Sequence, residues 1–325
     1  KNKIHKGVEV MRSTVNKKIV ELKELLNCGI ISITATPQAN LLLETIQSLS
    51  PDYCSYFEPS QNYTGLDIFH GSNSIIEIVE EDTDNIYKPG GGVPKSIRKA
   101  LNFYIVSSSV LKFFHNKHYK TQMLIHPDKK IGSHKIVESQ INLLINLEYK
   151  HLKNSSSDSS KDILKSFENI FLDFKTKYKD LPEFEEFLNN YIFDTISNIG
   201  TYLFNSENKN GIPLKRIIEI KNNHLILIGG DMLDRGVTIP NLIVSFMLRD
   251  SKTPQADTLI QRARWLGYRE KLDFTKVYLT KSLQERYQKL VDHEEVLSLA
   301  IRDYSDKNID MKLLSDLIIV LDEDI

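Results

Sequence analysis

The chain has 325 residues, 41% of them hydrophobic and 26% charged, which is ordinary for a globular protein with one large domain or two average ones. The formal net charge of −1 does not point to a nucleic-acid partner, although a basic groove can exist on a neutral protein. The two cysteines, Cys28 and Cys54, lack metal-type spacing and argue against a disulfide framework, which favours a cytoplasmic location. No apolar run approaches the roughly 18 residues of a membrane span. Because the first residue is Lys1 rather than Met, we expect a fragment of a longer protein.

The first 92 residues predict two helices with a buried strand between them. Apolar residues at helical spacing predict helices over 8–27 and 39–49. The segment 29–37 is rich in β-branched residues and ends at a proline, which predicts a buried strand that leads into a loop. Residues 75–79 are a strand candidate, followed by an acidic run. The sequence Pro-Gly-Gly-Gly at 89–92 is the strongest chain breaker and the best candidate for a linker.

The rest of the chain predicts strands that alternate with helices. Helices are expected over 94–115 and 135–150, on either side of a strand over 121–126. The serine-rich segment 153–161 is expected to be a mobile loop, and the aromatic-rich segment 162–204 to be helical. Apolar runs typical of parallel strands buried on both faces lie at 225–228, 242–248 and 275–279. This alternation predicts an α/β fold with a doubly wound, mainly parallel sheet.

Three short segments carry candidate chemistry. The first, Thr-Ala-Thr-Pro at 34–37, ends a predicted strand, and the second, 229–240, follows the strand over 225–228. Loops at the carboxyl ends of parallel strands are where open α/β sheets bind ligands. The third segment, 261–269, contains several arginines, whose planar and permanently charged guanidinium groups suit phosphate oxygens.

Each segment alone also fits a purely structural role. The first fits an ordinary strand end, the second a salt-bridged turn, and the third a group of arginines packed around Trp265. Their order along the chain is more informative than any one of them. We therefore interpret the three together as parts of one site.

In this order the segments resemble motifs III, V and VI of superfamily-two helicases. A closer resemblance is to the Z-one domain family, whose members are named as candidate endonucleases and occur near restriction and anti-phage genes. The matching segments are Ala-Thr-Pro-Gln-Ala-Asn at 35–40, Tyr-Thr-Gly-Leu-Asp-Ile-Phe at 63–69, Met-Leu-Ile-His at 123–126, Leu-Arg-Asp-Ser at 248–251 and Arg-Trp-Leu-Gly-Tyr-Arg at 264–269. One departure is Ala263, where the family usually has glycine, and it affects the local turn rather than the arginines.

The resemblance implies a domain organisation. Residues 89–280 would form a RecA-like helicase lobe with a mainly parallel sheet and a helical insertion over about 150–212. Residues 1–88 would be the C-terminal part of a preceding RecA-like lobe. Residues 281–325 would be a C-terminal helical extension.

The resemblance also implies a nucleotide site. Arg264 would be the arginine finger, and Arg269 a second phosphate or inter-domain contact. Gln261 would support the nucleotide site, while Thr34 and Thr36 would transmit the nucleotide state between the lobes.

A second set of residues would serve the nucleic acid. Three would couple it to the nucleotide, namely Asp234, Arg235 and Gly236. Three more would contact it directly, namely His126, Thr238 and Arg249.

Two elements of such a motor are missing from the chain. No Gly-x-x-x-x-Gly-Lys-Ser/Thr phosphate loop occurs, and the nearest match, 91–96, has Pro94 in place of an amide donor. The acidic segment 75–82 imitates a metal-binding strand, but it follows the Thr-Ala-Thr segment instead of preceding it, so we interpret it as a solvated loop. By the resemblance, ATP and Mg²⁺ would be bound mostly upstream of Lys1, and we expect the fragment alone to be inactive.

The expected function is therefore that of an ATP-dependent, helicase-like translocase or remodeller in restriction or anti-phage defence. DNA is favoured over RNA as its track, and a MORC-like ATPase, a methylase or a nuclease is a plausible partner by the resemblance. One alternative is a metal-dependent endonuclease, with Pro51-Asp52 and a Glu-x-Lys triplet at 148–150 or 219–221. Another is a non-hydrolysing interaction module that keeps a helicase fold.

Overall fold

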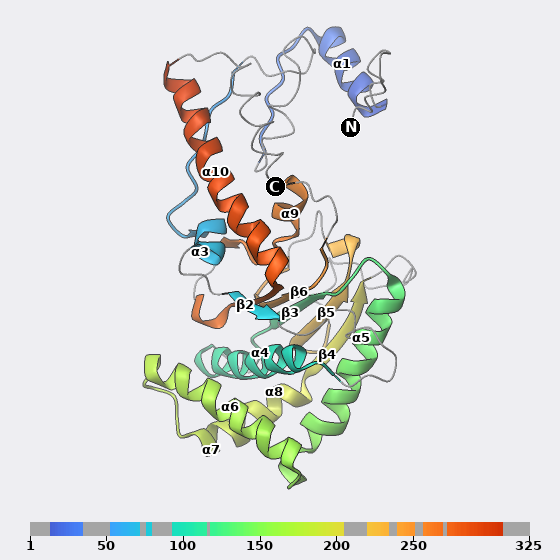
Figure 1. Cartoon of the computed structure of the whole chain (residues 1–325), viewed down its shortest axis with the longest axis vertical. Coiled ribbons are helices and arrows are strands. Elements are labelled where there is room, and N and C mark those ends of the chain that lie inside the picture. Colours follow the sequence, from blue (N-terminus) through green and yellow to red (C-terminus); the bar gives the residue numbers. More distant parts are fainter. Residues whose placement is uncertain are drawn as a thin grey trace. The chain divides into compact units, whose positions relative to one another are not determined.

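The computed structural model describes residues 14–34, 53–71, 76–79, 93–115, 118–204, 220–233, 239–250, 256–268 and 272–307 (Figure 1). These residues form two compact units. The first unit contains the described residues before Pro59, residues 256–257 and those from Asp292 onward. The second unit contains the remaining described residues, and its centre is a sheet.

The sheet has six strands in the order β2, β8, β6, β3, β5, β4, and all of these neighbours pair in parallel. The bounds are β2 Ile76–Val79, β3 Thr121–His126, β4 Ile199–Phe204, β5 His224–Gly229, β6 Leu242–Met247 and β8 Lys276–Thr280. The α/β fold with a mainly parallel sheet is therefore confirmed. So are the strands expected at 121–126, 225–228, 242–248 and 275–279, to within a residue or two at their ends.

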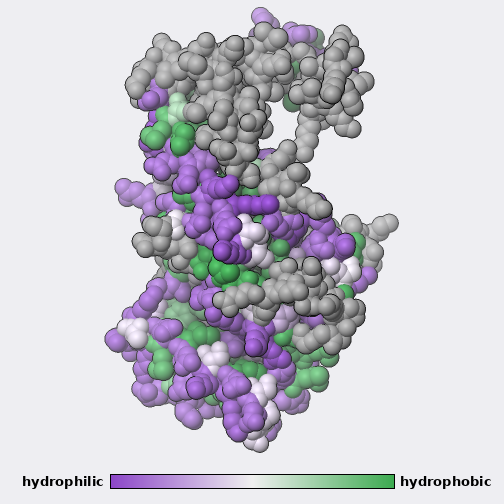
Figure 2. Space-filling view, in the orientation of Figure 1, coloured by the Kyte–Doolittle hydropathy of each residue, from purple (hydrophilic) through white to green (hydrophobic). Residues whose placement is uncertain are grey.

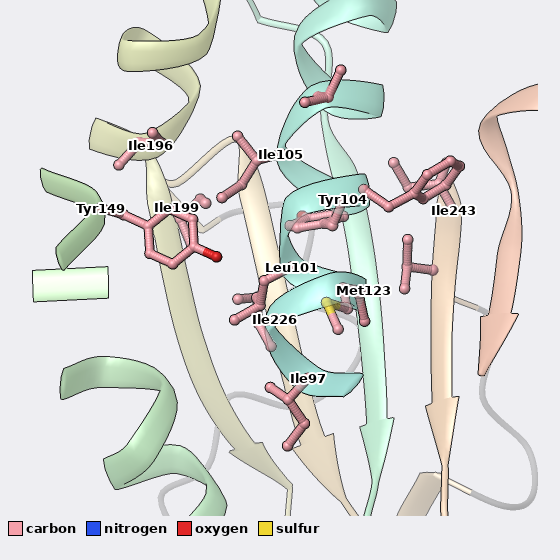
Figure 3. Packing of buried hydrophobic residues seen from close by; sticks show 14 of the residues in the cluster. Ile97, Leu101, Tyr104, Ile105, Met123, Tyr149, Ile196, Ile199, Ile226 and Ile243 are labelled. Atoms are coloured by element: carbon pink, nitrogen blue, oxygen red, sulfur yellow. The ribbon is translucent and has the colours of Figure 1, made fainter. Parts of the chain in front are cut away.

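The central strands β3, β5 and β6 are buried along their whole length, and burial on both faces explains the largely apolar sequences of β5 and β6. Helix α4 (Lys95–Phe114), expected over 94–115, covers one face of these strands. Figure 3 shows Ile97 and Leu101 of α4 lying over Met123 of β3 and Ile226 of β5. Burial of the apolar side chains between α4 and these strands stabilises the packing of the helix on the sheet.

A second layer of helices packs on α4. Its members α6, η4 and α8 contact α4 on the side away from the sheet (Figure 1). The chain reaches this layer through α5, which continues without a break into η2 and η3. The bounds are α5 Ile131–Leu143, η2 Leu144–Glu148, η3 Tyr149–Asn154, α6 Asp158–Lys177, α7 Phe184–Phe187, η4 Leu188–Ile192 and α8 Phe193–Ser197. The aromatic residues that marked this region in the sequence are its core, and the buried ones are Phe167, Phe171, Phe174 and Phe187.

Two expectations for this region are wrong. The helix expected over 162–204 does not reach its end, because Ile199–Phe204 is strand β4, which pairs with β5 along its whole length. Pairing with the open edge of β5 satisfies the backbone groups of this segment, and Gly200 weakens its preference for helix. The serine-rich segment 153–161 is mostly helical rather than a loop, since Ser157 caps α6 by accepting a hydrogen bond from the Ser160 amide at 3.2 Å.

Two expectations near the N-terminus are also wrong. The strand expected over 75–79 is confirmed in its described part as β2 (Ile76–Val79), an edge strand beside β8, so the interpretation of 75–82 as a solvated loop is wrong for these residues; residues 80–82 lie outside the described residues. The described part of the expected strand, 29–34, forms no strand, and the side chains of Ile31 and Ile33 are 90% and 92% exposed. A β-branched run becomes a strand only beside a partner strand, and no strand among the described residues pairs with this segment.

The remaining elements frame the sheet and its ends. The helix expected over 8–27 is present in its described part as α1, and the helical extension expected over 281–325 is present as α10 up to residue 307. The expected helix over 39–49 and the linker at 89–92 lie outside the described residues. The bounds are α1 Thr14–Leu26, β1 Tyr63–Thr64, α3 Leu66–His70, η6 Asp231–Leu233, α9 Ala256–Arg262, β7 Gly267–Tyr268, η7 Leu272–Phe274 and α10 Lys281–Lys307.

A buried hydrogen-bond network closes the amino end of the sheet. The Tyr104 hydroxyl donates to the Thr121 carbonyl oxygen at 3.0 Å, and the Thr121 hydroxyl lies 2.8 Å from Nδ1 of His224. Burial, together with the positive charge of Lys112, lowers the pKa of His224 to about 3. Lys112 is itself buried and pairs with Asp194 of α8. The imidazole of His224 is therefore neutral at physiological pH.

The visible face of the second unit is mainly polar. Figure 2 shows hydrophilic side chains over most of its visible face, with smaller hydrophobic areas among them. Among the described residues, no helix has both the length and the apolar character needed to cross a membrane.

Candidate functional site

The carboxyl end of the sheet contains a topological switch point between β3 and β6, which are neighbours. After β3 the chain continues through α5 toward β4, whereas after β6 it continues through α9 toward β8 on the opposite side. In open α/β sheets, ligands bind in the crevice outside such a point. The segments that follow β3, β5 and β6 are therefore the candidate site, and they contain several of the residues expected from the sequence.

His126 and Arg249 lie together at this switch point. Arg249 Nη1 donates to Nε2 of His126 at 3.2 Å, so the ring proton of a neutral His126 is on Nδ1. The Leu248 amide also donates to the His126 carbonyl oxygen, at 3.1 Å. His126 and Arg249 are only 2% and 4% exposed, so direct contact of either side chain with a nucleic acid would require them to be uncovered. Thr238 lies outside the described residues.

Asp250, the next residue, faces the start of α10. Its carboxylate pairs with Arg286 at 2.5 Å and accepts a hydrogen bond from the Ser282 hydroxyl at 3.2 Å. The Thr280 hydroxyl accepts from the Leu283 amide at 3.3 Å and so caps this helix. The segment that follows β6 is thus held from both sides, by β3 through Arg249 and by α10 through Asp250.

The loop that follows β3 was not singled out by the sequence. Nε2 of His134 donates to the Asp128 carbonyl oxygen at 2.6 Å, and the Asp128 carboxylate accepts from the Lys129 amide at 2.6 Å. Gly230 lies so close that a Cβ there would be 3.0 Å from Cε1 of His134 and 3.2 Å from the Asp128 carbonyl oxygen. This ordered turn leaves the side chains of Lys129 and Lys130 exposed at the switch point. Two adjacent lysines after a buried strand were the signal that could have identified them.

Arg264 contacts the segment that follows β5. Its Nε donates to the Leu233 carbonyl oxygen at 2.9 Å, and the Leu233 amide donates to the Gly230 carbonyl oxygen at 2.8 Å. Gly229 has no room for a side chain, since a Cβ would be 2.7 Å from the Phe204 carbonyl oxygen. The structure therefore brings the second and third sequence segments together through Arg264. Asp234, Arg235 and Gly236 follow Leu233 directly in the chain but lie outside the described residues.

The other residues expected at the nucleotide site are Gln261, Thr34, Thr36 and Arg269. Gln261 is half-buried on α9. Thr34 is exposed and belongs to the first unit. Thr36 and Arg269 lie outside the described residues. The roles expected for these four residues stay predictions.

A buried cluster around His70 supports the turn that carries Arg264. Nε1 of Trp265 donates to Nε2 of His70 at 3.1 Å, so the ring proton of His70 is on Nδ1, which donates to Oε1 of Gln284 at 2.8 Å. The His70 ring stacks on Tyr287 at 4.5 Å, and the Tyr287 hydroxyl donates to the Leu259 carbonyl oxygen at 3.0 Å. Burial lowers the pKa of His70 to about 4, and the bond to Gln284 opposes this shift only in part.

The same cluster joins two segments that are far apart in the sequence. Tyr63 pairs with Tyr268 and Thr64 with Gly267 in the antiparallel ribbon of β1 and β7. The resemblance motif at 63–69 and the motif at 264–269 are therefore one structure. His70 directly follows the first motif, a signal that sequence reasoning missed, whereas nothing in the sequence marked Gln284.

Charged groups elsewhere bear on the alternative functions. Both oxygens of the Glu148 carboxylate accept hydrogen bonds from Arg98, each at 2.7 Å, which lowers the pKa of Glu148. The carboxylate of the triplet at 148–150 is therefore engaged in an ion pair with α4. In the part of the chain that the structure describes, no three His, Cys, Asp or Glu side chains are grouped as a metal site would require.

Of the comparisons with known proteins, the one with protein families gives a match. No curated protein and no solved structure matches the chain. A family model described as the Z1 domain matches residues 96–316, which is more than half of the chain. The match covers the sheet from β3 to β8 and every site residue discussed above except Thr34, Thr36 and the segment 63–70. The chain therefore belongs to the Z1 domain family.

Proposed function

We propose that the protein is an ATP-dependent, helicase-like translocase or remodeller that acts on nucleic acid, with the second unit as a RecA-like lobe. The observation that carries the proposal is the bond between Arg264 and the Leu233 carbonyl oxygen. It joins the two segments to which the family resemblance gives the roles of nucleotide sensing and nucleic-acid coupling. A role in restriction or anti-phage defence is part of the proposal and rests on the family resemblance.

Arg264 is suited to act as an arginine finger. Its Nε donates to a backbone carbonyl, which restricts rotation of the guanidinium group, and the next residue, Trp265, is anchored in the buried cluster. A preoriented guanidinium stabilises charge that develops on a transferring phosphoryl group without first having to reorganise. Asp234 and Arg235 follow Leu233 in the chain. A shift of Arg264 on a change at the nucleotide would therefore be transmitted to this coupling segment through the bond to Leu233.

ATP and Mg²⁺ belong to the proposal as substrate and cofactor. The guanidinium of Arg264 suits a phosphate group of the nucleotide. The sequence contains no phosphate loop, so the proposal requires that this loop come from outside these 325 residues. What the present residues would supply is the finger and its coupling to the sheet.

The nucleic acid would lie at the switch point between β3 and β6. Lys129 and Lys130 are exposed there and can neutralise backbone phosphates. His126 and Arg249 would act from beneath, by fixing the loops that follow β3 and β6. This assignment replaces the direct contact expected from the sequence with a positioning role, and it explains why both side chains are buried.

The experiment is a measurement of ATP hydrolysis by the full-length protein with and without single-stranded or duplex DNA and RNA. We expect stimulation by one class of nucleic acid, and an affinity for it that falls steeply with salt because phosphate contacts release counterions. Binding without hydrolysis would favour the non-hydrolysing module instead. Strand cleavage without ATP would favour the endonuclease, although the ion pair between Glu148 and Arg98 is an observation against the triplet at 148–150 as its metal site.

A further inference from the structure

Two tyrosines stand exposed on the ribbon next to Arg264. Tyr268 is 68% exposed and Tyr63 is 37% exposed. Their ring centroids are 5.7 Å apart with an angle of 77° between the ring planes. The edge of one ring therefore meets the face of the other, and the pair forms a corner of two aromatic surfaces.

The backbone beneath presents these rings in a fixed direction. Gly267 has a φ of +133°, which side chains other than glycine rarely tolerate. This turn allows Trp265 to point into the core, where it is fully buried, while Tyr268 three residues later points to solvent. On the other strand, Phe69 and His70 are buried in the same way after the exposed Tyr63. The pair is thus preorganised by a buried cluster, which reduces the entropy lost on binding a ligand.

We propose that Tyr63 and Tyr268 form a stacking platform for a nucleobase. The inference rests on the proposed function and deepens it, since it assigns a site to the base where Arg264 serves the phosphates. Aromatic faces bind any base by stacking, so the platform needs no sequence specificity. Arg264 lies in the turn that leads into β7, and Tyr268 lies in β7 four residues later, so a guanidinium and an aromatic face close in sequence match the two chemical parts of a nucleotide. The base can belong to ATP or to a single strand of nucleic acid.

A purely structural role for the pair makes a different prediction. Cross-strand aromatic pairs stabilise a ribbon, so truncation of Tyr268 would then lower stability and leave ligand binding unchanged. The exposure of Tyr268 argues against that role as its main one, because a ring that serves packing alone gains more by being covered.

The test uses two fluorescent probes whose emission is quenched when the base stacks. One is 2-aminopurine riboside triphosphate and the other is a single-stranded oligonucleotide that contains 2-aminopurine. Both are titrated into the full-length protein and into Tyr268→Ala, Tyr268→Leu and Tyr268→Phe. Tyr53→Ala is the matched control, because Tyr53 is also a tyrosine and is 62% exposed. Leucine keeps apolar bulk without an aromatic face, so it separates stacking from folding.

For at least one probe, alanine and leucine should weaken binding about 5- to 150-fold and abolish the quenching. Phenylalanine and the control should stay within about twofold of the wild type. The probe that responds identifies the source of the base. Unchanged affinity and quenching in Tyr268→Ala and Tyr268→Leu, with a wild type that binds, would overturn the platform and leave the proposed function standing. A wild type that binds neither probe would overturn both.

Discussion

The buried histidine beneath Arg264 predicts a loss of stability in mild acid. His70 accepts a hydrogen bond from Trp265 on Nε2, and a proton on that nitrogen would end the bond. The pKa of His70 is about 4 in the folded protein, compared with roughly 6.5 in an unfolded chain. Between these values the unfolded state binds more protons than the folded state. The contribution of His70 is therefore fully present above the unfolded pKa and is lost as the pH falls toward the folded pKa.

The size of the effect follows from these two values. From pH 7 to pH 5, His70 should lower the free energy of unfolding by about 2 kcal/mol. His224, with a pKa of about 3, acts with the same sign and adds a similar amount. The variant His70→Gln removes one titrating group, while its amide can still accept from Trp265 and donate to Gln284. Because the stacking on Tyr287 is lost, it should be less stable at pH 7 by about 1 kcal/mol.

Urea denaturation followed by circular dichroism at pH 7, 6 and 5 measures both effects. Between pH 7 and pH 5, His70→Gln should lose about 2 kcal/mol less than the wild type. If His70→Gln and the wild type fall in parallel, His70 is not the neutral acceptor of the Trp265 bond, and the description of the cluster is wrong.

Two further variants test the backbone and the buried charge. Gly267→Ala should lower the free energy of unfolding by about 1–3 kcal/mol because Gly267 has a positive φ, even though an added Cβ would meet no atom within 4 Å. Gly132→Ala is the control, because an added Cβ there also meets no atom within 4 Å but the residue is helical. It should be neutral or stabilising in the same denaturation assay. Asp194→Asn leaves the buried Lys112 without its carboxylate and should cost on the order of 3 kcal/mol. Lys112→Met should cost less, since the half-exposed Asp194 stays hydrated; equal losses in calorimetry would refute this reasoning.

The core strands could be predicted from the sequence because they are buried on both faces. Strands β5 and β6 are largely apolar runs, and such runs indicate parallel strands without any knowledge of their neighbours. Strand β4 could not be predicted in this way. It is an edge strand of mixed polarity that follows an aromatic helix, and only the free edge of β5 makes it a strand.

Local sequence patterns also gave wrong predictions where strand formation depends on a neighbouring strand. The β-branched segment 29–34 has high strand preference, yet preference alone does not satisfy backbone hydrogen bonds. The opposite error concerned 76–79, which were interpreted as part of a solvated loop because of their place in the motif order, although β8 offers an edge with which they pair. In both cases the outcome depended on a strand far away in the sequence.

The motifs of the candidate site could be predicted from the sequence, but the hydrogen bonds that hold these motifs in place could not. Arg264 and the segment around Leu233 were identified from residue type and order, and the structure brings them together. The bond between His70 and Gln284 joins residues that are 214 positions apart, and no local sequence pattern predicts it. His126 and Arg249 were expected, together with Thr238, as separate nucleic-acid contacts, and only the structure shows that they bond to each other.

The central claim is that Arg264 stabilises a phosphoryl transition state, and its most direct test is turnover by the full-length protein. Arg264→Ala should lower nucleic-acid-stimulated ATP hydrolysis on the order of a thousandfold, with little change in ATP affinity, and Arg264→Lys should restore little because an ammonium lacks the planar fork. Arg98→Ala, which removes the ion pair with Glu148, is the arginine control and should change the melting temperature more than turnover. Turnover and melting temperature are measured on the same preparations. An Arg264→Ala protein that melts earlier but keeps wild-type turnover per folded molecule would contradict the claim and leave Arg264 a structural residue.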